Sequence, residues 1–134
     1  DSPLDLSLKI LIAEDNAVNR LVAKRLLKRL GYASTTVDNG RQALDFVGTN
    51  PCDVVFMDIQ MPVMDGFTAT RLIREHYPDS APAIVALTAS AVEGDRDRCL
   101  AAGMDDYIAK PVNIQTVRRV MSRFSSPEWT ASRG

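Results

Sequence analysis

The sequence predicts an α/β fold, with a doubly wound, five-stranded parallel sheet and five flanking helices. Four short apolar runs recur along the chain, at residues 10–13, 54–57, 84–87 and 107–109, and helical patterns lie between them. A continuous apolar strand is typical of a parallel sheet, because helices cover both of its faces. Right-handed crossovers between successive strands then place helices on both sides of the sheet.

The first helix is predicted to begin near Ala17, because Asp15 or Asn16 can cap its first turn. Gly31 is predicted to end this helix, since glycine is common directly after a helix. A fifth strand fits in the segment that follows, at residues 33–37. Within the helix, apolar side chains recur at helical spacing, at Val18, Leu21, Val22, Leu26 and Leu30.

Residues that interrupt helices indicate where the other four predicted helices begin and end. Gly, Pro, Asn and Asp residues flank each helical pattern, so the connections to the strands are predicted to be short. On this basis the further helices are predicted at residues 41–47, 67–76, 91–102 and 114–124.

Length and composition indicate one globular domain. The 134 residues leave no room for a second full domain. We expect the domain to span residues 9–124, with an N-terminal linker over 1–8 and a tail or linker stub over 125–134 in which Trp129 packs back. Apolar residues make up 46% of the chain and charged residues 25%, which is unlike a disordered protein.

Charge and hydropathy exclude several kinds of partner. The net charge of -1, from 16 basic and 17 acidic residues, offers no overall attraction to nucleic acid or to an anionic membrane. No apolar stretch is long enough to span a bilayer, and the acidic start lacks the features of a signal peptide. We therefore expect a cytoplasmic domain without direct membrane contact, although a longer parent protein can be anchored in the inner membrane.

Polar side chains follow the apolar strands where each strand ends. Because parallel strands end at the same edge of a sheet, these side chains should converge on one rim, where ligands of such folds bind. They are Glu14 and Asp15 after the first strand, Asp58 at the end of the third, Thr88 after the fourth and Lys110 after the fifth.

The three acids of this rim predict a metal site. A helix cap would account for a single acid such as Asp15 or Asp65, but it does not account for the whole set. Crowded carboxylates raise one another's cost of ionisation, so a bound cation would stabilise them. Oxygen ligands without cysteine or histidine favour Mg²⁺, for which Mn²⁺ can substitute.

A carboxylate beside such a metal can attack a phosphoryl group, because positioning and charge neutralisation supply most of the catalysis. Asp58 is the predicted nucleophile. Lys110 offers a positive charge to a phosphate oxygen, and the Thr88 hydroxyl can sense the phosphate by turning inward. Lys110 precedes Pro111, so this peptide bond is a candidate for the cis form, which would turn the chain sharply.

Four segments carry a resemblance to a known family. They are ILIAEDN at residues 10–16, MDIQMPVMDG at 57–66, ALTAS at 86–90 and GMDDYIAKP at 103–111. With these segments the chain resembles the response-regulator receiver domain over residues 9–124. The resemblance implies a flavodoxin-like sheet with strand order 2-1-3-4-5.

The resemblance also implies roles for individual residues. In this family the matching acids at Glu14 and Asp15 belong to a Mg²⁺ site, which the backbone carbonyl of Gln60 completes. Asp58 matches the residue that accepts a phosphoryl group from a phosphohistidine. Two further roles are implied, namely a phosphate contact for Lys110 and a switch pair formed by Thr88 and Tyr107. An isolated domain of this kind catalyses only its own phosphorylation and slow dephosphorylation, so it is not a turnover enzyme.

Finer features resemble receivers that are fused to hybrid sensor histidine kinases. EDNAVNR and AGMDDYIAKP are similar to that subgroup, and a stand-alone response regulator remains the alternative. The implied partner is the helical bundle of a histidine kinase dimerisation domain or of a histidine phosphotransfer domain. It is expected to bind the first helix, where outward positions are predicted at Asn19, Arg20, Ala23 and Lys24.

Three other kinds of protein fit the sequence less well. A phosphatase of the haloacid dehalogenase type needs a second acid two residues after the nucleophile, and that position is Gln60. A dinucleotide or flavin module lacks its glycine-rich motif here. A docking domain that works without phosphorylation would not need the complete set of acids, threonine and lysine.

Overall fold

The computed structural model describes residues 3–89 and 93–129. Its five parallel strands form one sheet in the order β2-β1-β3-β4-β5, which confirms the predicted fold. Along the chain, the elements alternate as β1 (Ile10–Ala13), α1 (Ala17–Arg29), β2 (Ser34–Val37), α2 (Gly40–Thr49), β3 (Val54–Asp58), α3 (Gly66–His76), β4 (Ala83–Thr88), α4 (Glu93–Ala101), β5 (Asp106–Ala109) and α5 (Ile114–Phe124).

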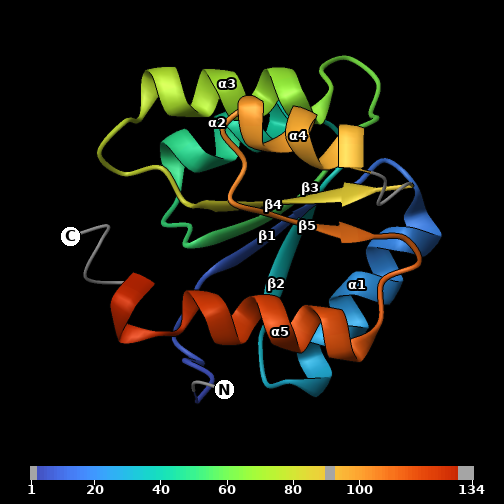
Figure 1. Ribbon diagram of the computed structural model, residues 1–134, viewed down its shortest axis with the longest axis vertical. Helices are drawn as coiled ribbons and strands as arrows, with labels where there is room; N and C mark the ends of the chain where they lie inside the picture. Colours follow the sequence, from blue (N-terminus) through green and yellow to red (C-terminus); the bar gives the residue numbers. More distant parts are fainter. Residues whose placement is uncertain (1–2, 90–92, 130–134) are drawn as a thin grey trace.

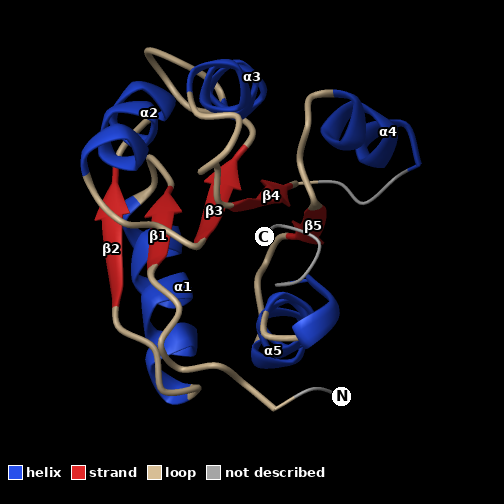
Figure 2. Ribbon diagram, turned by 90° about the vertical axis from the view of Figure 1, so that its left-hand side faces the viewer, coloured by secondary structure: helices blue, strands red, loops and turns tan. Residues whose placement is uncertain are grey.

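The helices form two layers around the sheet. Helices α1 and α5 cover one face, and α2, α3 and α4 lie on the other (Figures 1 and 2). Neighbouring residues of a strand therefore enter different cores: Ile10 and Ile12 pack with α1 and α5, whereas Leu11 and Ala13 pack with α2 and α3. Burial on both faces explains why the strands are apolar throughout.

Side chains at the helix ends explain where the helices start and stop. Asn16, and not Asp15, caps α1 by accepting a hydrogen bond from the Asn19 backbone N–H at 3.0 Å. Asn113 and Thr116 form a capping box at the start of α5. After α1, Gly31 has φ of +104°, a conformation that other residues rarely adopt.

Most predicted bounds differ from the observed ones by one or two residues. The strands β3 and β4 extend to Asp58 and Thr88, so these polar residues are the last residues of their strands. The predicted helix at 91–102 is observed as α4 from Glu93, and residues 91 and 92 lie outside the described part of the chain.

The outward face of α1 differs from the prediction. Ala23 was expected to face outward, but it is 5% exposed and packs with Leu27 against the sheet. Three apolar residues assigned to the helical pattern are instead exposed, at 68% for Val18, 47% for Leu21 and 39% for Val22. The buried face of α1 is therefore rotated toward Ala23 and Leu27, which are one helical turn apart.

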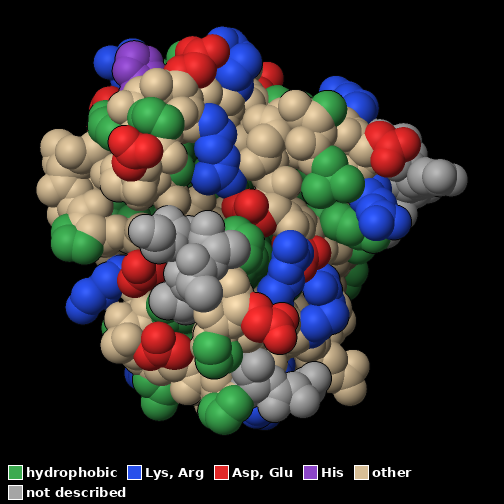
Figure 3. Space-filling view, turned by 60° about the vertical axis from the view of Figure 1, so that its left-hand side comes forward, with side chains coloured by type: hydrophobic (Ala, Val, Ile, Leu, Met, Phe, Trp, Pro, Cys, Tyr) green, Lys and Arg blue, Asp and Glu red, His purple; other side chains and the backbone are tan. Residues whose placement is uncertain are grey.

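Both ends of the described chain lie against α5. A helical turn at residues 127–129 follows α5, and the ring of Trp129 packs edge-on against Phe124, with centroids 4.6 Å apart. The backbone N–H of Asp5 donates to Ser125 Oγ at 2.8 Å. On the face in Figure 3, acidic and basic side chains are interspersed, in keeping with the small net charge. Within the described residues, no helix has the length and apolar character needed to cross a bilayer.

Candidate functional site

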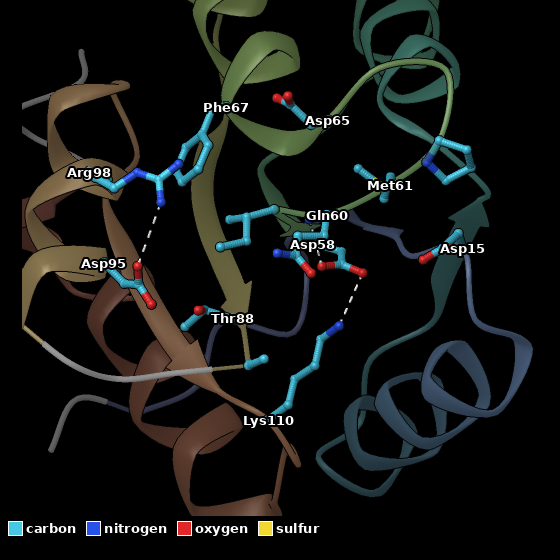
Figure 4. Close-up of a pocket in the computed structure, with 13 residues that line it drawn as sticks. Asp15, Asp58, Gln60, Met61, Asp65, Phe67, Thr88, Asp95, Arg98 and Lys110 are labelled. Carbon is cyan, nitrogen blue, oxygen red and sulfur yellow. Dashed lines mark hydrogen bonds and ion pairs between the residues drawn. The ribbon is translucent and has the colours of Figure 1, made fainter.

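The polar residues predicted from the strand ends lie together at the carboxyl edge of the sheet. Asp58 and Thr88 end β3 and β4, and Glu14 and Lys110 directly follow β1 and β5. A cavity of about 630 Å³ opens at this edge, and Asp15, Asp58, Thr88 and Lys110 are among the residues that line it (Figure 4). The parallel register explains this convergence, because all five strands end on the same side.

The structure brings the three acids into one cluster. Glu14, Asp15 and Asp58 each place a carboxylate oxygen within 4.8 Å of the others. Glu14 is 1% exposed and Asp58 is 3% exposed, whereas Asp15 is exposed to solvent. Two of the negative charges are thus removed from water, and the third lies at the opening.

Lys110 is the cation of this cluster. Its Nζ lies 3.0 Å from Asp58 Oδ2 and 3.1 Å from Glu14 Oε2. Burial opposes the charge of this lysine, but its close contacts with the Asp58 and Glu14 carboxylates outweigh burial and raise the pKa of Lys110. The Lys110–Pro111 peptide bond is cis. One ammonium group therefore serves two buried carboxylates.

Glu14 is only partly satisfied. Its Oε1 accepts the Asn16 backbone N–H at 3.2 Å, whereas Oε2 meets Lys110 without hydrogen-bond geometry and has no other partner among the described residues. Burial raises the pKa of Glu14, and the neighbouring Asp58 carboxylate raises it further. An unsatisfied buried oxygen in a cluster of three acids fits a site that holds a hard cation.

Backbone contacts hold the Asp58 side chain in place. Its Oδ1 accepts the Gln60 backbone N–H at 3.0 Å. Gly66 packs so closely that a side chain there would overlap the Asp58 carbonyl oxygen, and Asp65 caps α3 by accepting the Thr68 N–H at 2.7 Å. The start of α3 therefore supports the end of β3, and the Asp58 carboxylate points into the cavity (Figure 4).

Thr88 and Tyr107 lie on the same face of the sheet. Thr88 is 2% exposed and lines the cavity, whereas Tyr107 is half-buried. The register pairs Tyr107 with Ala86, which is two residues before Thr88 in β4, so the two side chains point to the same side. The guanidinium of Arg96 lies 6.0 Å from the centre of the Tyr107 ring.

Three lining residues were missed by the sequence analysis. Asp95 and Arg98 reach the cavity from α4, and Phe67 reaches it from α3. The sequence of α4, EGDRDRCLA, is polar over its first six residues and apolar only at its last three, so no apolar stripe runs along the helix to indicate which side faces the sheet. Motif spacing alone could not identify which of its charged residues line the cavity.

Comparisons with known proteins agree with this geometry. A family model described as the response regulator receiver domain matches residues 10–122. Hybrid signal transduction histidine kinase H of Dictyostelium discoideum is 43% identical in an alignment of 132 positions, which covers 92% of this chain and 10% of the kinase. Probable histidine kinase 1 of Oryza sativa subsp. indica is 34% identical over 95% of this chain and 16% of its own length. The chain thus spans a small part of these relatives.

Two solved structures are similar over most of the chain. One is the receiver domain of a sensor histidine kinase from Pseudomonas aeruginosa, with magnesium in its active-site cleft; the TM-score is 0.79 and the identity 43%, over 87% of this chain and 96% of that one. The other is a Saccharomyces cerevisiae receiver domain bound to a histidine phosphotransfer protein, with a TM-score of 0.83 and 28% identity over 88% of each chain. The chain belongs to the response regulator receiver domain family.

Proposed function

We propose that Asp58 accepts a phosphoryl group from a phosphohistidine in a Mg²⁺-dependent reaction. The observation that carries this proposal is the buried Asp58 carboxylate, which points into a cavity beside two further acids and the Lys110 ammonium. The similarity to receiver regions of hybrid kinases supports a parent protein of that kind, and a stand-alone response regulator is the alternative. Within either protein, residues 9–124 would form the receiver, and its place would be the cytoplasm.

Glu14, Asp15, Asp58 and the backbone carbonyl of Gln60 would hold the Mg²⁺ ion, or Mn²⁺ in its place. The excess of negative charge and the unsatisfied Glu14 oxygen fit a hard divalent cation. When bound, Mg²⁺ would neutralise negative charge on the phosphoryl oxygens. A magnesium ion in the cleft of the Pseudomonas relative supports the same assignment here.

The remaining chemistry needs few groups of the protein. An oxygen of Asp58 would form a bond to phosphorus while the P–N bond to the histidine breaks, and the imidazole would keep the electron pair. The Gln60 backbone N–H fixes one Asp58 oxygen, and Lys110 would offer its charge to the incoming phosphate. The Gln60 side chain stands where a phosphatase has its second acid, so the domain would lose its phosphoryl group slowly.

The acyl phosphate would act on the rest of the domain through Thr88 and Tyr107. The Thr88 hydroxyl would turn toward the phosphate, and the Tyr107 ring would move into the space that it leaves. Their common face of the sheet and the half-buried position of Tyr107 support this coupling. The domain would exist in two conformations, and phosphorylation would favour the one with which the phosphoryl group interacts more strongly.

The partner would be a helical bundle that carries the donor histidine. The exposed apolar residues Val18, Leu21 and Val22 of α1 offer it an apolar surface. A hollow of about 70 Å³ joins this surface to the site, because Val22, Glu14 and Lys110 all line it. The phosphotransfer complex of the yeast relative supports such a partner, which would be a histidine kinase dimerisation domain or a histidine phosphotransfer domain.

Intact-mass spectrometry tests the proposed nucleophile and metal together. The protein is incubated with acetyl phosphate, with Mg²⁺ or with a chelator, as wild type and as Asp58→Ala. We expect one Mg²⁺-dependent phosphoryl adduct that hydroxylamine removes and that is absent from Asp58→Ala. Asp53→Ala is the matched control and should still form the adduct. An adduct that persists in Asp58→Ala would overturn the assignment.

A second experiment tests the switch. Binding of the partner bundle is compared before and after phosphorylation, in wild type and in Tyr107→Ala. We expect the affinity to change on phosphorylation in the wild type and to change much less in the variant. An equal change in both proteins would exclude Tyr107 from the coupling.

A further inference from the structure

The cavity beside Asp58 extends well beyond the acid cluster. Its volume of about 630 Å³ is in the range of small-molecule sites. Figure 4 shows Asp15 on one side of the cavity and Asp95 and Arg98 on the other, with Asp58 and Lys110 between them. A phosphoryl group at Asp58 would fill only part of this volume, so the side formed by α4 remains open to the rest of a phosphoryl donor.

Arg98 is the second cation of this cavity. Among the lining residues in the described ranges, the acids are Asp15, Asp58, Asp65 and Asp95, and the cations are Lys110 and Arg98. Lys110 already contacts the buried carboxylates of Asp58 and Glu14. Arg98 has a weaker ion pair, 3.8 Å from Asp95, and its side chain is 67% exposed. An anionic donor can therefore reach Arg98 without breaking a buried contact.

An aromatic ring holds the Arg98 guanidinium at the cavity. The guanidinium carbon lies 4.9 Å from the centre of the Phe67 ring, within the range of a cation–π contact. Phe67 follows Gly66, which packs directly on the Asp58 carbonyl, so the ring is tied to the end of β3. A planar guanidinium offers paired N–H donors that match a carboxylate. This arrangement is suited to an anion that enters beside Asp58.

We propose that Arg98 binds the leaving carboxylate of small-molecule acyl phosphates and so favours these donors. The inference rests on the proposed phosphorylation of Asp58. In the reaction, an Asp58 oxygen bonds to phosphorus, the acyl C–O–P bridge breaks at phosphorus, and the carboxylate leaves with the electron pair. No proton has to move. A phosphoramidate releases neutral ammonia instead, which offers no charge to Arg98.

Two donors and four proteins test this assignment. Initial rates of adduct formation are measured by intact mass, with acetyl phosphate and with phosphoramidate in Mg²⁺. The proteins are the wild type, Arg98→Met, Arg98→Lys and Arg71→Met. Methionine keeps an apolar stem over Phe67 without the charge, and lysine keeps the charge without the planar fork. Arg71 is the matched control, because it is an exposed arginine of α3 that pairs with Glu75 at 3.5 Å and does not line the cavity.

We expect Arg98→Met to react about fivefold more slowly with acetyl phosphate, since a partly exposed ion pair contributes up to about 1 kcal/mol. The rate with phosphoramidate should stay within about twofold, and Arg98→Lys should recover part of the loss with acetyl phosphate. Arg71→Met should match the wild type with both donors. High salt should reduce the difference between wild type and Arg98→Met, because salt screens exposed charges.

The outcomes separate this inference from the one on which it rests. Equal losses with both donors would mean that Arg98 only positions α4 and would overturn the donor preference. Unchanged rates in Arg98→Met would overturn it as well. If the wild type itself formed no adduct, the proposed function of Asp58 would fail, and the role of Arg98 with it. A loss confined to acetyl phosphate would support both.

Discussion

Two clusters of this domain that contain buried acids differ in how their charge is balanced. The acceptor cluster consists of Glu14, Asp15 and Asp58 with Lys110, which pairs with Glu14 and Asp58, so the acids outnumber the cation. The arginine clasp consists of Asp106 with Arg119 and Arg123, so two cations serve one acid. Both clusters contain nearly inaccessible carboxylates, with Glu14 1% and Asp106 7% exposed. Burial therefore does not distinguish them, but the balance of charge does.

This difference shifts the pKa values of Glu14 and Asp106 in opposite directions. Burial raises the pKa of Glu14, and the Asp58 carboxylate adds to that effect. Burial also opposes the ionised form of Asp106, but hydrogen bonds from Arg119, the Tyr107 backbone N–H and Arg123 outweigh it and lower the pKa of Asp106. The clasp is complete by itself and holds α5 to β5. The acceptor cluster has excess negative charge and is suited to a cation and a phosphoryl group.

The largest expected effect comes from breaking the clasp. Asp106→Ala should lower the free energy of unfolding by about 2 kcal/mol, because it leaves two arginines without their shared acid. Those arginines are half-exposed, at 54% and 47%, which keeps the loss below that of a fully buried pair. Urea unfolding followed by circular dichroism measures the change. A loss as small as that of a surface ion pair would show that the clasp contributes little.

Lowering the pH should remove part of the stabilisation that the clasp contributes to the free energy of unfolding. The lowered pKa of Asp106 means that, below about pH 4, the unfolded chain binds a proton at this residue before the folded one does. The stabilisation is therefore present above that pH and is lost as the pH falls through the lowered pKa. Urea unfolding between pH 2 and pH 6 should give a steeper loss for wild type than for Asp106→Asn. If the free energy of unfolding fell equally with pH in both proteins, the lowered pKa of Asp106 would be contradicted.

Completing the acceptor cluster with metal should stabilise the domain. At a Mg²⁺ concentration ten times the dissociation constant, the expected gain is about 1.4 kcal/mol relative to chelator. Thermal melts at several Mg²⁺ concentrations measure it. Asp106→Ala should keep the same gain from Mg²⁺, since the clasp lies outside the acid cluster, whereas Asp58→Asn should lose most of it. A gain that survives in Asp58→Asn would place the metal elsewhere.

Without metal, the same replacement of an acid should have opposite signs in the two clusters. Asp58→Asn should raise the free energy of unfolding in chelator by about 0.5 to 1 kcal/mol, because it removes one of three repelling charges. Asp106→Asn should lower it. Urea unfolding of both variants in chelator makes the comparison direct. A clear loss of stability in Asp58→Asn would mean that its contact with Lys110 outweighs the repulsion.

The smallest effect is expected at an exposed pair. Arg41 and Asp45 lie 3.4 Å apart on α2, and their side chains are 62% and 64% exposed. Asp45→Asn should therefore change the free energy of unfolding by less than about 0.5 kcal/mol, with or without Mg²⁺. This variant calibrates the effect of removing an acid from the surface. A change comparable to that of Asp106→Asn would undermine the comparison between the clusters.

Features that depend on local sequence patterns could be predicted, whereas features that depend on contacts between distant residues could not. An apolar run indicated β1 and a helical pattern with its flanking breakers indicated α5, both with their observed bounds, and the polar residues after the runs indicated the acceptor cluster. The arginine clasp was not predicted. Asp106 and its arginines are separated by 13 and 17 residues, and their contact depends on how α5 lies against β5.

Which side of each helix is buried was the feature hardest to predict from the sequence. Several apolar residues follow one another around α1, and their spacing led to the wrong prediction that Val22 lies on the apolar face and Ala23 faces outward. Packing against the sheet selected the small Ala23 together with Leu27. In α4, the largely polar sequence indicated no buried face, and only the tertiary structure places Arg98 over Phe67 of α3.

The sequence by itself determined the alternation of strands and helices and the identity of the residues at the strand ends. Both depend on local patterns, and a parallel sheet necessarily brings its strand ends together. Only the tertiary structure decided which side of each helix is buried, how Asp106 is satisfied and which cation lies across the cavity from Asp15. Those features depend on contacts between residues distant in sequence, where differences of a few ångströms decide whether two charged groups meet.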